Sequence, residues 1–241
     1  MRTLLVLGAK PEPALPPPGM VDAVACANAS GRSAADRGLP EPLFTVMTAL
    51  LTDGSAAGRS RIEAVRGLAT GRLVYYPRPD AKGGAFKRLR HAWRTRSQRP
   101  EVLLRELGAV GYRHVSFEKR AMADFARLIL ERAGHEPEVE AALARKQASS
   151  GALAVALATA EPGFDRVVVA GFSFELTQAF GFDPNIALRG TAASKHRDTD
   201  VTVLAALARH NPLFTTEPAV HDQAGVPLLP GSAPCAVRLE D

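Results

Sequence analysis

The chain has 241 residues, of which 46% are hydrophobic and 6% aromatic, and its formal net charge is +5 at pH 7. These values suit one domain with an aliphatic core, and no apolar run approaches the roughly 20 residues that span a bilayer. The positive charge favours acidic partners: nucleotides, phosphorylated sugars, anionic lipids or nucleic acids. The two cysteines, Cys26 and Cys235, are too few for a zinc ribbon or a disulfide framework, which predicts a reducing, cytoplasmic setting.

The first half of the chain predicts short buried strands separated by turns. The apolar run at residues 3–7 stops at Gly8, which is typical of a buried strand and not of a signal peptide. Further strands are predicted at 22–26, 43–51 and 72–76, with a short helix at 59–66.

The second half predicts mainly helices. Apolar residues recur at helical spacing at 101–107, 119–133 and 136–147, and further helices are predicted at 152–160, which is rich in Ala, and at 198–210. The last segment has Asp198 or Thr199 as a natural N-cap, and strands are predicted at 166–170 and 213–216. This alternation predicts an α/β fold: a single Rossmann-like domain over residues 1–241, with a mostly parallel sheet flanked by helices. The aperiodic segment 172–197 is predicted to be a mobile lid within that domain.

Two predicted strands end at a glycine. Gly8 follows the first strand, and Gly171 follows the strand at 166–170, with Phe172 and Ser173 after it. The carboxyl ends of parallel strands meet at the edge where α/β proteins bind nucleotides, so we expect these residues at a nucleotide site. An ordinary strand-end turn is an equal alternative for Gly8. Neither the dinucleotide fingerprint nor a P-loop follows Gly8, so an NAD enzyme or a P-loop ATPase is not predicted.

Polar residues beside two other elements are further candidates for the nucleotide site. Asn28 follows the second strand, and its amide suits a base edge or a ribose hydroxyl, although an Asx-turn is the alternative. Ser149, Ser150 and Gly151 precede an Ala-rich helix, where hydroxyls and unpaired helix amides form a phosphate cradle. A plain N-cap is the alternative for the two serines.

His196 is the candidate catalytic base. It lies just ahead of a predicted helix, which suits proton transfer. Lys195 and Arg197 flank it and are expected to stabilise a leaving phosphate, and Asp200 is expected to orient the imidazole. The alternative is a solvated charged loop.

The segment 82–99 is strongly basic. Its basic residues are Lys82, Lys87, Arg88, Arg90, Arg94, Arg96 and Arg99. Phe86, Leu89 and Trp93 fall on one helical face, which predicts an element that lies on an anionic membrane surface. Packing of the three residues on the core is the alternative. No nucleic-acid partner is predicted, because no helix-turn-helix, RNP or zinc pattern accompanies the charge.

In their order these features resemble the bacterial sialyltransferases that act on lipooligosaccharide and capsule. Ser149-Ser150-Gly151 is similar to the Thr-Ser-Gly or Ser-Thr-Gly that precedes a helix in that family, and 167–174 is similar to its strand ending in Gly-Ile-Asp-Phe. The segment 198–201, with Leu204 and Leu207 after it, resembles the helix that follows the family's catalytic histidine. The likeness covers most of the chain through short motifs.

The resemblance implies a variant nucleotide-sugar transferase fold with a small lid. It implies transfer of a nonulosonic acid from its CMP conjugate to a surface glycan or glycolipid, with inversion and without a cofactor or an essential metal. His196 would deprotonate the acceptor hydroxyl. The implied CMP site is lined by Gly8, Asn28, Ser150, Gly151, Gly171, Phe172 and Ser173.

The chain departs from the family pattern at several positions. Ala9 stands where the family has Asn, and Ser173 stands where it has an acidic residue. Lys195 occupies the position that an ungapped match gives to the base, one residue before His196. The donor is therefore left open between sialic acid and a related sugar such as Kdo.

Two other functions stay open. One is a Mg²⁺-dependent phosphotransferase of the pterin-pyrophosphokinase-like kind, for which Asp53, Asp165 and Asp183 are the loop acids available. The other is a non-catalytic nucleotide-binding module at a membrane. The sequence does not predict the oligomeric state.

Overall fold

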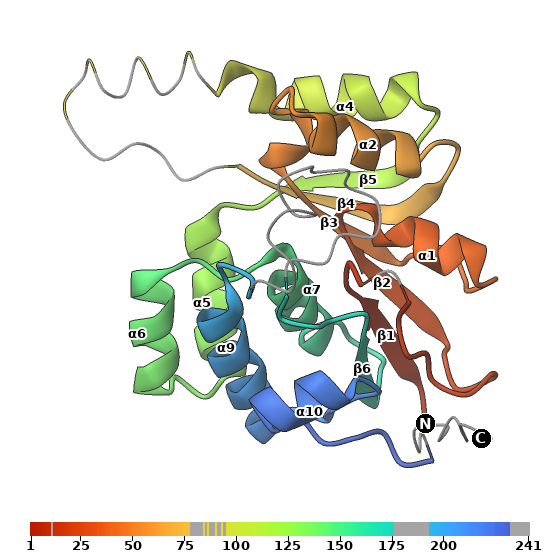
Figure 1. Cartoon of the computed structure of the whole chain (residues 1–241), viewed down its shortest axis with the longest axis vertical. Helices are drawn as coiled ribbons and strands as arrows, with labels where there is room; N and C mark the ends of the chain where they lie inside the picture. Colours follow the sequence, from red (N-terminus) through yellow and green to blue (C-terminus); the bar gives the residue numbers. More distant parts are fainter. Residues whose placement is uncertain are drawn as a thin grey trace, which may run out of the picture.

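A computed structural model of the chain describes residues 1–10, 12–77, 84, 86, 90, 93, 95–175 and 193–231. Seven strands in these ranges form one sheet of order β5-β4-β3-β2-β1-β6-β7, in which every neighbouring pair is parallel (Figure 1). The strands are β1 (Thr3–Leu7), β2 (Ala23–Ala27), β3 (Phe44–Thr48), β4 (Ala69–Tyr76), β5 (Arg113–Lys119), β6 (Arg166–Ala170) and β7 (Leu213–Thr215). The predicted single α/β domain with a parallel sheet is confirmed.

Helices lie on both sides of the sheet. The α-helices are α1 (Gly31–Asp36), α2 (Ala56–Ala64), α4 (Pro100–Ala109), α5 (Met122–Arg132), α6 (Pro137–Arg145), α7 (Ser150–Thr159), α9 (Arg197–His210) and α10 (Pro218–Ala224). Short 3₁₀ turns are η1 (Asn28–Ser30), η2 (Ala49–Thr52) and η3 (Arg96–Gln98). Helices α1, α2 and α4 pack on one face, and α5, α6, α7, α9 and α10 lie on the other (Figure 1).

The core has two layers because the strands bury both of their faces. In β1, Leu4 and Val6 point into the layer that contains α7, whereas Leu5 and Leu7 point into the layer that contains α1. All four side chains are fully buried. Strands of parallel sheets are near-continuous apolar runs for this reason, which is why β1 and β6 were predicted within their observed bounds.

Helix α7 is apolar around its whole circumference because it is enclosed. It contacts β1, β2, β3 and β6 on one side and α5 and α9 on the other. Its N-terminal Ser150 hydrogen-bonds to Tyr76, the last residue of β4. The first turn of α7 therefore lies at the carboxyl edge of the sheet.

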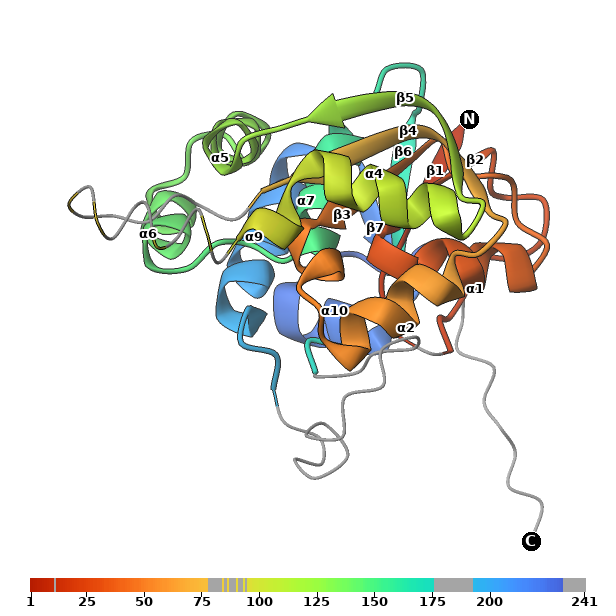
Figure 2. The same cartoon turned by 90° about the horizontal axis from the view of Figure 1, so that it is seen from above.

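One predicted strand was too long, and one strand was missed. The strand expected at 43–51 ends at Thr48, because the Thr48 hydroxyl accepts a hydrogen bond from Leu50 N and turns the chain into η2. Strand β5 was not predicted, and it takes the first residue of the helix expected at 119–133. Strand β5 lies at the edge of the sheet (Figure 2) and exposes most of its side chains, so its sequence lacks an apolar run.

The start of α9 also differs from the prediction. The N-cap is His196 and not Asp198 or Thr199, and the side chain of His196 makes no capping bond. A turn that precedes the helix explains the earlier start: Arg197 N donates to Ser194 O, and Asp200 N donates to His196 O. The short helices α1 and α10 were not predicted.

Several predictions fall outside the described residues. They include most of the lid expected at 172–197, part of the basic segment at 82–99, Cys235 and Asp183. Cys26 lies in the core as expected of a small apolar residue, and its burial raises the pKa of its thiol to about 12. None of the helices in the described ranges combines the length and the apolar character that crossing a membrane requires.

Candidate functional site at the carboxyl edge of the sheet

The order of the strands reverses between β1 and β6, because β2 to β5 extend from one side of β1 while β6 returns to its other side. Open α/β sheets bind ligands at such a switch point. Gly8 and Gly171 meet there: Gly8 N donates to Ala170 O at 2.8 Å, and a Cβ on Gly8 would lie 2.3 Å from Gly171 O. Gly171 has a φ of +75°, which favours glycine. The structure thus brings together the two glycines that end β1 and β6.

The Phe172 ring lies between the switch point and α7. A Cβ on Gly8 would lie 2.8 Å from this ring, and a Cβ on Gly151 would lie 2.6 Å from it. The ring is buried and belongs to the core layer around α7. The Phe172 ring therefore packs in the core between Gly8 and Gly151, and the main chain of Phe172 stays a predicted part of the nucleotide site.

Asn28 joins the ends of β2 and β3. Its Oδ1 accepts a hydrogen bond from Thr48 N at 3.1 Å, and its φ is +53°. Asn adopts this left-handed conformation more readily than most residues with a side chain. The two N–H donors of its Nδ2 have no protein partner within the described ranges, so they are available to a ligand at this edge.

A buried pair of hydroxyls joins β4 to α7. Tyr76 Oη and Ser150 Oγ lie 2.6 Å apart, and Tyr76 also bonds to the Thr48 side chain. Burial raises the pKa of the Tyr76 hydroxyl, which therefore stays protonated. Ser150 Oγ is engaged with Tyr76, and Ser150 also has its backbone N–H to offer a ligand. That N–H and the one of Gly151 lie in the first turn of α7 and have no partner in the described part of the chain.

Ser149 and Asp200 join α7 to α9. Ser149 Oγ caps α7 by accepting a bond from Ala152 N at 3.3 Å, and Ser149 N donates to Asp200 Oδ1 at 2.8 Å. Burial raises the pKa of the Asp200 carboxyl to about 6, although the hydrogen bonds from Ser149 act in the opposite direction. Asp200 therefore holds the start of α7.

The half-buried imidazole of His196 is held by a main-chain carbonyl. Nδ1 lies 2.8 Å from Gln147 O. A carbonyl oxygen only accepts, so Nδ1 must carry the proton, and the neutral ring then keeps its lone pair on Nε2. Burial lowers the pKa of His196, and Lys195 and Lys146 lower it further, although the bond to Gln147 raises it. The expectation that Asp200 orients this ring is wrong, because Gln147 accepts from Nδ1 and Asp200 bonds to Ser149.

The two basic neighbours of His196 are both exposed. Arg197 Nε donates to Gln223 Oε1 of α10 at 3.0 Å, which turns that guanidinium toward α10. Lys195 has no hydrogen-bond partner in the described part of the chain. Ser173 is half-buried, and its Oγ accepts a bond from Glu175 N at 3.4 Å.

The sequence did not single out Thr48, Tyr76 or Gln147 as site residues. Thr48 and Tyr76 are the last residues of β3 and β4, at the same sheet edge as Gly8 and Asn28. A polar residue that ends a buried strand was the signal that could have found them. Gln147 acts through its main chain, which leaves no signal in the sequence.

Two of the acids nominated for a magnesium site, Asp53 and Asp165, do not meet. Asp53 follows β3, whereas Asp165 precedes β6 and accepts a hydrogen bond from Arg2 N, just ahead of β1. The two carboxylates therefore lie at opposite edges of the parallel sheet and cannot bind one ion together. In the described ranges no three His, Cys, Asp or Glu residues cluster in a way that could hold a metal ion.

Several solved structures are similar to the chain. A variant of the sialyltransferase CST-II in complex with CMP aligns with a TM-score of 0.53 and 13% identity, over 95% of this chain and 87% of that one. The sialyltransferase CstII from Campylobacter jejuni with the substrate analogue CMP-3FNeuAc aligns with a TM-score of 0.50 and 14% identity, over 95% and 87% of the two chains. The same enzyme with cytidine-5'-monophosphate gives 0.50 and 13%, over 95% and 86%.

The chain shares the fold of these sialyltransferases. No family model and no curated protein sequence matches it. At these identities the likeness concerns the fold, the Rossmann-like arrangement that the sequence predicted.

Proposed function

We propose that the chain is a glycosyltransferase that moves a sialic acid-like or Kdo-like nonulosonate from a CMP-sugar to a surface glycan or glycolipid. Transfer inverts the anomeric centre and needs neither a metal nor a cofactor, since the charge of the leaving phosphate is met by protein groups. The shared fold supports the class of enzyme. In this proposal the enzyme takes part in polysaccharide biosynthesis and acts on the cytoplasmic side of a membrane.

The observation that carries this proposal is the contact between His196 Nδ1 and Gln147 O, from which the tautomer of the ring follows. The bond from Nδ1 to Gln147 O leaves the lone pair of Nε2 unprotonated, and Nε2 has no partner within the described ranges. The lowered pKa keeps the ring neutral at pH 7. A neutral imidazole with an accessible lone pair is a general base.

The reaction is a single displacement at the anomeric carbon of the donor. The acceptor oxygen forms a bond to that carbon while its proton moves to His196 Nε2. The bond between the carbon and the phosphate oxygen breaks on the opposite face, and CMP leaves with the electron pair. His196 then releases the proton to solvent, so that a glycoside, CMP and a proton are the products.

The donor is placed at the switch point. Its cytidine and ribose lie against Gly8, Gly171 and the Nδ2 of Asn28, where glycine admits close backbone approach. The phosphate faces the first turn of α7, where the N–H groups of Ser150 and Gly151 and the helix dipole favour an anion.

Nucleotide binding and turnover test the proposal together. The purified chain is titrated with CMP, CDP, UDP, GDP, ADP and ATP, with and without Mg²⁺, and then assayed with CMP-sialic acid and CMP-Kdo. We expect Mg²⁺-independent binding of cytidine nucleotides and release of CMP. A ligand at about 100 times its Kd stabilises the folded state by roughly 2.7 kcal/mol, which a melting curve detects.

The His196→Ala variant separates catalysis from binding. We expect it to lose turnover by about 10²-fold or more while CMP affinity is kept. His221→Ala is the matched control, since His221 Nδ1 also bonds to a carbonyl, Val226 O, at 2.9 Å. ATP-dependent transfer that requires Mg²⁺ would favour a phosphotransferase, and CMP binding without transfer from either donor would favour a non-catalytic module.

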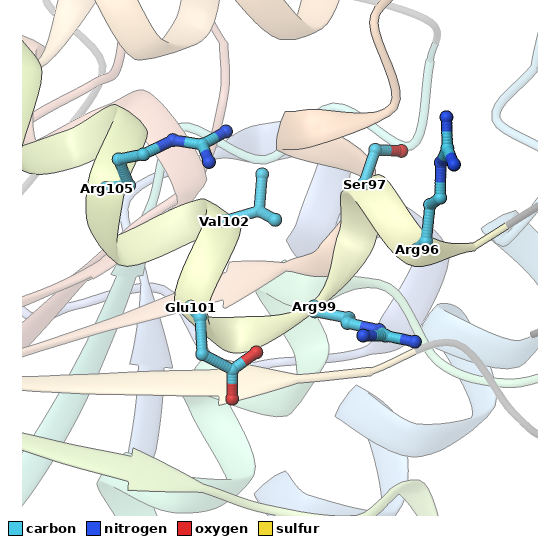
Figure 3. Close-up of a pocket in the computed structure, with 6 residues that line it drawn as sticks. All are labelled: Arg96, Ser97, Arg99, Glu101, Val102 and Arg105. Atoms are coloured by element: carbon cyan, nitrogen blue, oxygen red, sulfur yellow. The ribbon is translucent and has the colours of Figure 1, made fainter. Parts of the chain in front are cut away.

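We also propose that the basic surface around η3, formed by Arg96, Arg99 and Arg105, contacts an anionic membrane. Phe86 is 78% exposed and Trp93 66% exposed, so neither packs on the core as the alternative required. The Arg96 guanidinium stacks on the Trp93 ring, 5.2 Å from its centre. A pocket of about 580 Å³ beside them is lined by Arg96, Ser97, Arg99, Glu101, Val102 and Arg105 (Figure 3).

Vesicle sedimentation tests this surface. Each basic residue near an anionic leaflet contributes about 1 kcal/mol, and the exposed rings insert at the headgroups. Wild type should sediment with phosphatidylglycerol vesicles and not with phosphatidylcholine vesicles, and the paired change Trp93→Ala and Arg99→Ala should reduce this. Arg145→Ala, on α6, is the charge control. Equal sedimentation of the paired variant and wild type would overturn the proposal.

A further inference from the structure

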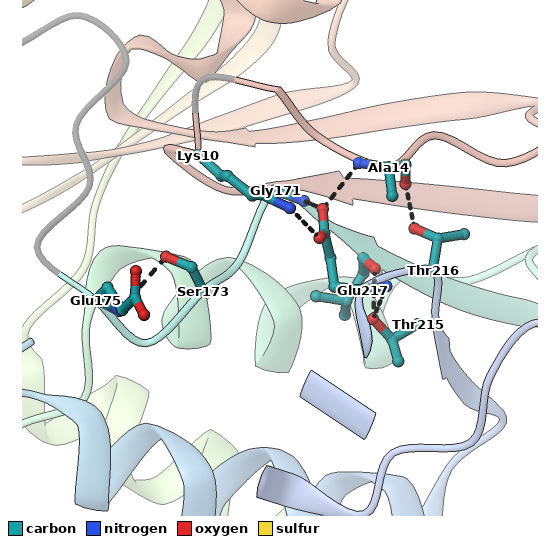
Figure 4. Close-up of polar contacts among 9 residues, drawn as sticks. Lys10, Ala14, Gly171, Ser173, Glu175, Thr215, Thr216 and Glu217 are labelled. Carbon is teal, nitrogen blue, oxygen red and sulfur yellow. Dashed lines mark hydrogen bonds and ion pairs between the residues drawn. The ribbon is translucent and has the colours of Figure 1, made fainter. Parts of the chain in front are cut away.

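The carboxylate of Glu217 lies where three distant segments meet, at the end of β7. Its Oε1 accepts hydrogen bonds from Ala14 N at 2.9 Å and from Gly171 N at 2.8 Å, and its Oε2 accepts from Lys10 Nζ at 2.6 Å (Figure 4). Glu217 is 1% exposed. A buried carboxylate needs such partners, so its position is over-determined by the strand ends around it.

Lys10 is the cation of this pair and lies at the switch point. Its backbone N donates to Gly171 O at 3.0 Å, two residues beyond Gly8. Gly171 is therefore bonded on both sides, with its N–H on Glu217 and its carbonyl on Lys10. Gly171 thus links Lys10 and Glu217 through the main chain as well as through their ion pair.

In this ion pair the carboxylate of Glu217 is shielded from solvent, whereas the ammonium group of Lys10 is partly exposed. Lys10 is 34% exposed, against 1% for Glu217. An ammonium group has three N–H donors, and Glu217 Oε2 is the only acceptor that Lys10 Nζ has in the described part of the chain. Two donors remain for a ligand.

We propose that Lys10 contacts the phosphate of the bound nucleotide, and that Glu217 is the positioning residue that aims its ammonium group. This inference rests on the proposed function and names a contact for the donor's anionic group. A lysine at the switch point stabilises a phosphate by charge-assisted hydrogen bonds. Its position is fixed before the ligand arrives, so little side-chain entropy is lost on binding.

The experiment compares CMP with cytidine, which lacks the phosphate, by calorimetry. We expect Lys10→Met to weaken CMP binding by about 10- to 100-fold and to leave cytidine binding unchanged. Lys10→Arg should restore part of the CMP affinity. Glu217→Gln should weaken CMP more than cytidine, because the ammonium group loses its anchor. The melting temperature of each unliganded variant is measured alongside.

The matched control is Lys119→Met. Lys119 is exposed at the carboxyl end of β5, at the same edge of the sheet but four strands from β1. It should leave both affinities unchanged. If Lys10→Met does not fold, Lys10→Gln is measured in the same way.

Equal losses for CMP and cytidine in the Lys10 variants would make Lys10 a structural residue, and no loss would exclude the contact. Either result would leave the proposed function standing as long as wild type binds CMP. If wild type binds no nucleotide, both proposals fall.

Discussion

The hydroxyl groups of Tyr76 and Ser150 lie 2.6 Å apart and join the end of β4 to the first turn of α7. Both residues are buried, so the bond fixes α7 against the sheet at the edge where the candidate site lies. Tyr76 also reaches the Thr48 side chain, and Thr48 N bonds to Asn28. One bonded chain therefore extends from the end of β2 to α7.

Replacing Tyr76 with Phe should cost about 1–3 kcal/mol of unfolding free energy, because the Ser150 hydroxyl is left buried without this partner. It should also weaken CMP binding, since the first turn of α7 loses its anchor. Tyr75→Phe is the control: Tyr75 is buried on the other face of the sheet, where its hydroxyl donates to Gln98 O. Urea unfolding should give similar losses for both variants, with a change in CMP affinity for Tyr76→Phe alone.

The sequence predicts those parts of the fold that have a clear local signal, such as a continuous apolar run. The strands β1 and β6 are apolar runs that are followed by Gly8 and Gly171. The bounds of both strands were predicted, and so was the position of the two glycines at the carboxyl edge of the sheet. Strand β5 was missed because an edge strand needs no apolar face. Helix α10 was missed although Pro218 begins it and Gly225, with φ +64°, ends it, and these are recognisable start and stop signals.

The sequence placed Gly8, Asn28 and Gly171 at one edge of the sheet, but the hydrogen-bond partners at that edge were not predictable. Asp200 was expected to orient the imidazole of His196, but it bonds to Ser149 N. Nδ1 of His196 instead donates to the main-chain oxygen of Gln147, which lies between α6 and α7, and the packing of both helices against α9 brings it near. Contacts of this kind arise from tertiary structure, so a local pattern does not contain them.

The two glycines around the Phe172 ring give a prediction about packing. Gly8→Ala should destabilise the fold by about 1–3 kcal/mol, because its Cβ would meet backbone, the Gly171 carbonyl at 2.3 Å. Gly151→Ala should cost less, since the atoms in its way are the far end of the Phe172 ring at 2.6 Å. Gly108→Ala, in α4 with open space around it, should cost nothing or stabilise. Urea unfolding of the three variants tests the order, and an equal cost for Gly8→Ala and Gly108→Ala would contradict it.

The buried carboxyl of Asp200 gives a prediction about pH. Its pKa is raised from 3.8 to about 6, so the folded state binds the proton more tightly than the unfolded state. Its contribution to stability is therefore lost as the pH rises between these two values. Between pH 5 and pH 8 the loss is roughly 1 kcal/mol.

The comparison of Asp200→Asn with wild type isolates this contribution. The variant should lack that loss, so its stability relative to wild type should improve by roughly 1 kcal/mol from pH 5 to pH 8. Asp198→Asn, an exposed residue in the same turn, should show no such change. Urea unfolding at both pH values provides the measurement. If Asp200→Asn and wild type showed the same pH dependence of stability, a group other than Asp200 would be responsible for it.

The charges next to His196 give a prediction about the pH dependence of turnover. Lys195 and Lys146 lower the pKa of the ring, because each disfavours a second positive charge nearby, and burial acts in the same direction. Turnover should therefore persist at pH 6.5 and fall only as the pH drops through the lowered pKa of His196. Lys195→Met removes one of these charges, so the acid limb of the profile should move to higher pH. An NMR titration of the His196 ring should move in the same direction, whereas Lys119→Met should change neither. If the titration of the His196 ring moved in Lys195→Met while the acid limb of turnover stayed where it is in wild type, the acid limb would have to come from another group, and His196 would lose its place as the base.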